Sequence, residues 1–202
     1  MNSLGQLLRR EVNPLLAAIV CAAVLVGSLM LMIQGRAAIL REGSEIVLKV
    51  APVDPRDLMR GDYVILRYDA ISRVDGSLLL EAWPDHDSYV PLWLTLETGE
   101  DGLGQISAVT MDKPETAPAD AVYLKSEPVL LRAENHPKTG SMTLSLKFGI
   151  ERYYVPEGEG LEIEAARNQG RTTVAIRVAE NGTAQIARLM IDGETLYQEP
   201  RY

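Results

Sequence analysis

The chain is nearly without cysteine: among its 202 residues only Cys21 carries a thiol. Cys21 lies inside an apolar N-terminal run, so the remainder of the chain has no cysteine at all. This pattern excludes a disulfide framework, and it fits an export compartment in which unpaired thiols are a liability.

Positive charge is also scarce, because 20 lysines and arginines stand against 28 aspartates and glutamates, for a net charge of −8. Residues 1–36 carry a net +2, which leaves −10 for residues 37–202. The average field of such an acidic domain repels nucleic acid and anionic lipid headgroups. No nucleic-acid partner is therefore expected.

The sequence has only two histidines, His86 and His136, and they stand in separate loop-like stretches. The glycines within residues 99–104 lie beside Glu100 and Asp101, whose charges would repel a phosphate group. We therefore expect neither a metal site nor a cofactor.

Aromatic residues make up only 5% of the chain, and three of them, Trp83, Tyr89 and Trp93, stand close together. If they are exposed they form a binding patch, and if they are buried they belong to the core. We expect them in the core.

The sequence does contain one long apolar run. Residues 14–33 contain no charge, and 20 residues at about 1.5 Å per residue cross roughly 30 Å of hydrocarbon. This predicts a transmembrane helix, and Arg9 and Arg10 before it place the N-terminus in the cytoplasm. A cleaved signal peptide is the alternative, but the run is longer than an ordinary signal core, and Arg36 interrupts the nearest small-residue cleavage motif.

After this anchor, short alternating segments between turn residues predict a mainly β domain with a minor helical part. One short helix is expected within residues 157–168. The expected strands cover residues 45–53, 63–73, 78–82, 90–96, 105–111, 121–125, 129–133 and 142–150. We divide the chain into a tail and anchor, residues 1–36, and a β-rich domain, residues 37–202, with a sub-boundary near residues 134–140 as an alternative.

The clearest hairpin is predicted near the C-terminus, where residues 171–179 and 184–191 flank Asn181-Gly182. Asn-Gly can adopt positive φ at both central positions of a type I′ turn. A two-residue loop pairs Val174 with Leu189, Ala175 with Arg188, Ile176 with Ala187, and Arg177 with Ile186.

The segment Pro52–Tyr68 combines turn residues with acids, bases and phenols. Side chains alternate along a strand from Tyr63 on, so residues 63, 65 and 67 face one way and residues 64, 66 and 68 face the other. In one interpretation Asp62, with Arg56, Arg60 and Tyr63 nearby, forms a polar surface that recognises a partner or ligand. In the other the arginines pair with neighbouring acids to fix the turn, and Tyr68 is half-buried.

Within this segment, Gly61-Asp62-Tyr63-Val64-Ile65-Leu66-Arg67-Tyr68 resembles the pattern that names the GDYXXLXY family of bacterial membrane-anchored proteins. The stretch from Phe148 to Gly158 is similar to a second family segment, Tyr-Gly-Ile-Glu-(basic)-Tyr-Phe-Val-Pro-Glu-Gly. This chain departs from that segment at Phe148 and Tyr154. Glu151 and Glu157 are the carboxylates that the second segment supplies.

The resemblance implies a single-pass protein of the bacterial inner membrane, with a periplasmic domain that binds or assists a multi-spanning membrane protein. The binding interpretation predicts an exposed apolar or aromatic patch near residues 54–68. The alternative is an envelope hydrolase that draws its carboxylates from Asp62, Glu151 and Glu157. For a binding surface the candidate residues are Arg60, Asp62, Tyr63, Tyr68, Glu151 and Glu157.

Overall fold

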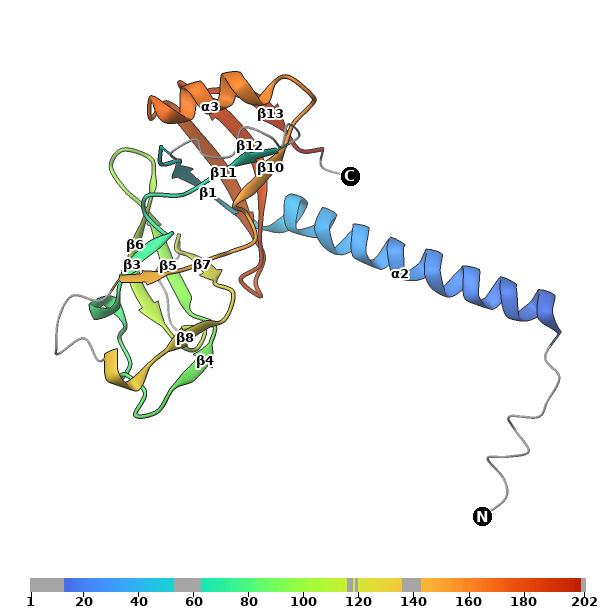
Figure 1. The fold of residues 1–202 in the computed structure, drawn as a ribbon, viewed down its shortest axis with the longest axis horizontal. Coiled ribbons are helices and arrows are strands. Elements are labelled where there is room, and N and C mark those ends of the chain that lie inside the picture. Colours follow the sequence, from blue (N-terminus) through green and yellow to red (C-terminus); the bar gives the residue numbers. More distant parts are fainter. Residues whose placement is uncertain (1–12, 53–62, 116–117, 119, 136–142, 201–202) are drawn as a thin grey trace, which may run out of the picture. The chain divides into compact units, whose positions relative to one another are not determined.

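The computed structural model describes the chain except residues 1–12, 53–62, 116–117, 119, 136–142 and 201–202. Its contacts divide the chain into two units, Met1–Ala38 and Ile39–Tyr202. Figure 1 colours the elements along the sequence. The second unit is rich in strands, as the sequence predicts.

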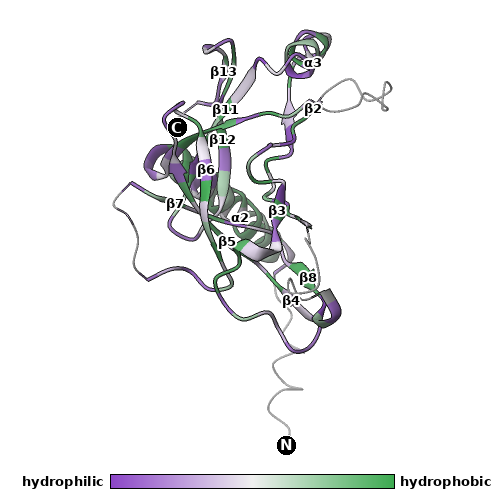
Figure 2. Cartoon of the chain, turned by 90° about the vertical axis from the view of Figure 1, so that its left-hand side faces the viewer, coloured by the Kyte–Doolittle hydropathy of each residue, from purple (hydrophilic) through white to green (hydrophobic). Residues whose placement is uncertain are grey.

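The helix α2 (Pro14–Glu42) begins where Asn13 caps it: the Asn13 Oδ1 accepts a hydrogen bond from the Leu15 amide at 3.0 Å. Residues of α2 are mainly hydrophobic (Figure 2), and the helix is long and apolar enough to cross a membrane. It runs on past the uncharged stretch and ends before Gly43, which separates it from the first strand.

The largest sheet has the strand order β1 (Ser44–Lys49), β11 (Thr172–Val178), β12 (Ala184–Ile191) and β13 (Glu194–Gln198), with antiparallel pairing throughout. A short helix, α3 (Gly160–Asn168), precedes β11 and packs against it. The helix expected within residues 157–168 is confirmed. The mainly β fold with one short helix and a C-terminal hairpin is confirmed as well.

A second sheet places β5 (Trp93–Thr98) between β6 (Gly104–Thr110) and β7 (Val122–Lys125). The described residues also form three two-stranded ladders: β2 (Tyr63–Ile65) with β10 (Arg152–Tyr154), β3 (Arg73–Asp75) with β9 (Thr143–Ser145), and β4 (Ser88–Val90) with β8 (Val129–Leu131). Two 3-10 turns lie at Gly76–Leu78 and Ala133–Asn135. The strand expected at residues 78–82 is therefore wrong.

The C-terminal hairpin pairs Val174 with Leu189 and Ala175 with Arg188, as predicted. A β-bulge then shifts the register, so Ile176 lies opposite Ile186, and the predicted pairing with Ala187 is wrong. Five residues, not two, connect the strands, and within the turn only Gly182 has positive φ. Asn181 instead accepts a hydrogen bond from the Thr183 amide.

The type I′ turn lies one connection later. Asp192 and Gly193 have φ of 54° and 84°, and Ile191 pairs with Glu194 directly across them. Asp-Gly is a favoured sequence for such a turn. It starts the edge strand β13, which is not among the expected strands.

One continuous core of buried side chains joins the sheets and ladders of the second unit. Trp83 belongs to this core, and its indole donates a hydrogen bond to the Arg132 carbonyl at 2.8 Å. Trp93 is buried too, so the expected burial of both tryptophans is confirmed. Tyr89 is 71% exposed, so its expected burial is wrong.

Candidate functional site

The strand β2 has one buried face and one exposed face. Val64 and Leu66 are fully buried, and Ile65 between them is 39% exposed. Arg67 is exposed and Tyr63 is partly exposed. The alternation predicted from the sequence is therefore confirmed. Some side chains of the GDYXXLXY motif pack in the core, and the others lie at the surface.

Tyr68 belongs to the buried side. Its side chain is 1% exposed, and its hydroxyl donates a hydrogen bond to the Ile150 carbonyl at 2.7 Å. Burial, with the nearby charge of Glu151, raises the pKa of this phenol well above its ordinary value. Tyr68 therefore joins the two motif segments through the core, and the expectation that it is half-buried is wrong.

The partner strand β10 comes from the second motif segment and pairs Tyr154 with Tyr63 and Tyr153 with Val64. Tyr153 points inward: its ring lies 6.1 Å from that of Tyr197, and its hydroxyl is hydrogen-bonded to Glu199. Burial, with the charge and hydrogen bond of Glu199, raises the pKa of Tyr153. This residue attaches the ladder to the edge strand β13.

The other side of the ladder forms a surface that we call the motif face: Tyr63, Ile65, Arg152 and Tyr154. The rings of Tyr63 and Tyr154 lie 6.0 Å apart, tilted by 57°. The Arg152 guanidinium carbon lies 5.5 Å from the Tyr63 ring centroid, in a cation–π arrangement. Tyr154 is 72% exposed. An exposed aromatic patch thus lies next to the first motif segment, as the binding interpretation predicts.

Arg167 of α3 supports this strand from behind. Its side chain is 2% exposed, and its Nη1 donates to the Ile65 carbonyl at 2.7 Å. Burial lowers the pKa of Arg167, Glu164 opposes that shift, and the charge of Arg67 adds to it. A buried guanidinium therefore occupies a backbone acceptor of β2 and fixes the strand that carries the motif face.

Residues 25–189 match the sequence profile of the GDYXXLXY protein family. The match covers most of the chain. The chain belongs to the GDYXXLXY family. No curated protein and no solved structure matches it.

The predicted site residues of this family member lie in different parts of the structure. Tyr63 lies on the motif face and Tyr68 in the core, whereas Arg60 and Asp62 lie outside the described residues. Glu151 is partly buried, and its Oε1 accepts a hydrogen bond from the Phe148 amide at 2.6 Å. This contact uses the carboxylate to close the turn before β10.

Glu157 is exposed in the turn before α3. With Asp62 outside the described residues, the three carboxylates of the hydrolase alternative are not placed as a set, and that alternative stays a prediction. The sequence reasoning missed Arg152, Tyr154 and Arg167. Alternation on β10 could have indicated the first two, because Arg152 and Tyr154 flank the buried Tyr153.

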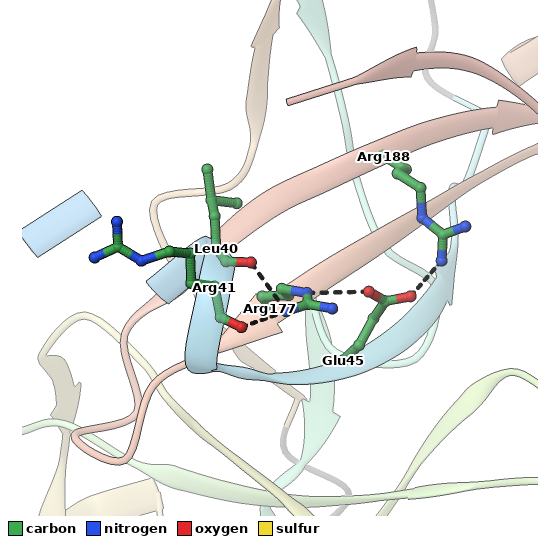
Figure 3. Close-up of polar contacts among 5 residues, drawn as sticks. All are labelled: Leu40, Arg41, Glu45, Arg177 and Arg188. Atoms are coloured by element: carbon green, nitrogen blue, oxygen red, sulfur yellow. Dashed lines mark hydrogen bonds and ion pairs between the residues drawn. The ribbon is translucent and has the colours of Figure 1, made fainter. Parts of the chain in front are cut away.

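A second polar cluster lies at the end of α2, whose last turn belongs to the second unit. Arg177 donates from Nη1 to the carbonyls of Leu40 and Arg41, each at 2.9 Å, and from Nε to Glu45 Oε2 at 3.1 Å. The other Glu45 oxygen accepts from Arg188 (Figure 3). These contacts satisfy carbonyls that a helix end leaves unpaired.

Glu45 is the acid shared by both arginines. Burial alone would raise its pKa, but the hydrogen bonds and charges of Arg177 and Arg188 outweigh burial, so the pKa of Glu45 is lowered. The cluster ties β1, β11, β12 and the helix end together. We interpret it as structural, because Glu45 engages both arginines at once.

Proposed function

We propose that this protein is a single-pass anchored binding module that engages an integral membrane protein through its motif face. In this proposal α2 crosses the bacterial inner membrane, the N-terminus is cytoplasmic and the β-rich domain is periplasmic. The support for the anchor is the length and apolar character of α2. The support for its direction is Arg9 and Arg10.

The observation that carries the binding role is the motif face. Tyr63 and Tyr154 expose aromatic surface, and the Arg152 guanidinium lies over the Tyr63 ring. Tyrosine and arginine are enriched among the residues that dominate binding energy in protein interfaces. Tyrosine brings a large contact area at low entropic cost, because it has only two rotatable side-chain bonds.

The buried face of the same ladder prepares this surface for binding. Val64 and Tyr153 pack in the core, and Arg167 holds the Ile65 carbonyl. The exposed side chains thus stand on a strand pair whose position the core already determines. A preorganised surface loses less entropy on association.

Anchoring favours a partner in the same membrane. A domain tethered beside the bilayer meets neighbouring membrane proteins at a high effective concentration, so a modest patch is sufficient for association. The patch contains no disulfide, and the proposal requires no cofactor.

The test is site-specific photo-crosslinking in living cells of the native host. A photoreactive phenylalanine replaces Tyr154, and in a matched control it replaces Tyr89, which lies on the β4–β8 ladder and is equally exposed at 71% against 72%. We expect position 154 to capture one defined membrane protein that position 89 does not capture. Equal capture at both positions, or none at position 154, contradicts the proposal.

A further inference from the structure

We infer that the motif face recognises an acidic segment of its protein partner. This inference rests on the proposed function and specifies the partner's chemistry: a carboxylate-bearing stretch with an apolar side chain close by. We infer the chemistry of this partner segment from the charged side chains at the motif face and from their contacts.

The first observation is that Arg152 is an exposed cation held in place without a carboxylate. Its guanidinium lies over the Tyr63 ring, and among the described residues no acid lies within salt-bridge distance of it. Among the described residues, no hydrogen bond uses its guanidinium, and a contact with a ring face leaves N–H donors available to a ligand. Planar N–H pairs of this kind match a carboxylate in bidentate geometry.

The second observation is that a further exposed arginine lies on the same side of β2 as the motif face. Arg67 follows Ile65 on the exposed side, and its Nη2 donates to the Pro52 carbonyl at 2.9 Å, an uncharged acceptor. Arg167 lies behind the strand, close enough for the charge of Arg67 to affect it. Among the described residues, Glu164 lies 4.0 Å from the buried Arg167, and Glu151, which precedes Arg152, uses its Oε1 to accept from the Phe148 amide. The two exposed arginines, Arg67 and Arg152, take part in no ion pair in the described part of the chain.

The third observation is the contrast with the rest of the domain. Residues 37–202 carry −10, yet the motif face presents Arg152 beside two phenol rings. A short acidic segment meets this local positive charge at contact distance. Repulsion from the more distant acids is screened over about 8 Å at physiological salt.

The same contrast decides against a lipid surface. An anionic bilayer is broad, so it would meet the average negative field of the domain as well as the local arginines. The two tyrosine rings, 6.0 Å apart, instead offer an apolar contact sized for a side chain beside the carboxylate. The geometry therefore favours a protein segment over a membrane surface.

The experiment uses the full-length chain in its native host, with the photoreactive phenylalanine at position 154. Mass spectrometry maps the captured segment, and Arg152→Glu is compared with Arg132→Glu. Arg132 is a matched control, because it is an exposed arginine whose reversal gives the same change in net charge. We expect Arg152→Glu to lower capture by about tenfold or more, because like charges would then face each other. The control should retain capture.

A charge swap decides the inference. Replacing an acid of the captured segment by arginine should restore capture to the Arg152→Glu chain. A mapped segment without aspartate or glutamate near the cross-link, capture of phospholipid, or undiminished capture by Arg152→Glu overturns the inference.

The two proposals fail in different ways. If wild-type position 154 captures no protein, the binding function itself fails. If it captures a protein whose yield falls with Tyr63→Ala but not with Arg152→Glu, the binding function stands and the acidic-segment inference falls. Thermal unfolding of each variant checks that the fold is intact, since Arg152 is exposed.

Discussion

Tyr68 of the GDYXXLXY motif should respond to substitution as a structural residue. Tyr68→Phe removes the hydroxyl that donates to the Ile150 carbonyl at 2.7 Å, in a site that is 1% exposed. The phenyl ring still fills the core, so the cost comes from the lost hydrogen bond and from a buried carbonyl left without this donor. Such a loss costs about 2 kcal/mol.

In the 164-residue unit Ile39–Tyr202, about 2 kcal/mol corresponds to a fall in Tm of roughly 4–8 °C. Intrinsic tryptophan fluorescence of the full chain in detergent measures it, because Trp83 and Trp93 are both buried in this unit. Tyr89→Phe is the matched control, since it removes a hydroxyl from a 71% exposed ring. The control should change the unfolding free energy by less than about 0.5 kcal/mol.

The pH dependence of this difference adds a second check. The folded pKa of Tyr68 is raised above the ordinary value of 10.0, so the hydroxyl's contribution is fully present below pH 10. It is lost as the pH rises through the raised value. The gap between wild type and Tyr68→Phe should therefore be constant from neutral pH to about pH 10. A gap no larger than that of Tyr89→Phe would refute the assignment of Tyr68 as a structural donor.

Two further predictions concern the end of α2. In Gly43→Ala the new Cβ would lie 2.6 Å from the Ile39 carbonyl oxygen, so we expect a lower Tm. The control Gly35→Ala, whose Cβ would meet nothing within 4 Å, should leave the Tm unchanged or raise it. Equal responses of the two variants would contradict the close approach at Gly43. In Glu45→Gln the acid shared with Arg177 loses its charge, so the variant should be less stable than wild type above pH 4.5, the ordinary carboxyl value. Because the folded pKa is lowered, that deficit should shrink as the pH falls through it, and a deficit independent of pH in urea titrations would rule out the charge of Glu45 as its cause.

The sequence was sufficient where a local pattern decides the structure. An uncharged run of 20 residues predicts the apolar helix, because length and composition alone determine whether a helix can cross a membrane. Alternation along residues 63–68 predicts which motif side chains are buried, because the period of a strand is two. The short helix α3 follows from equally local signals.

Predictions failed where several elements compete for one position. Asn181-Gly182 can form a type I′ turn, but Gly182 is held against β7: its carbonyl accepts from the Lys125 amide, and a wider turn forms. The type I′ turn forms at Asp192-Gly193, where β13 pairs directly with β12. Turn preference alone does not choose between two competent dipeptides, because the packing around each decides which geometry fits.

By itself the sequence determined a long apolar helix, a β-rich acidic domain and the two faces of the motif strand, since each depends on residues near one another in the chain. Only the tertiary structure decided what those faces meet. It pairs Tyr63 with Tyr154, sets Arg152 over a ring and buries Arg167 behind Ile65, across separations of about a hundred residues. Such contacts depend on how the chain folds back on itself, and no local period or turn signal encodes them.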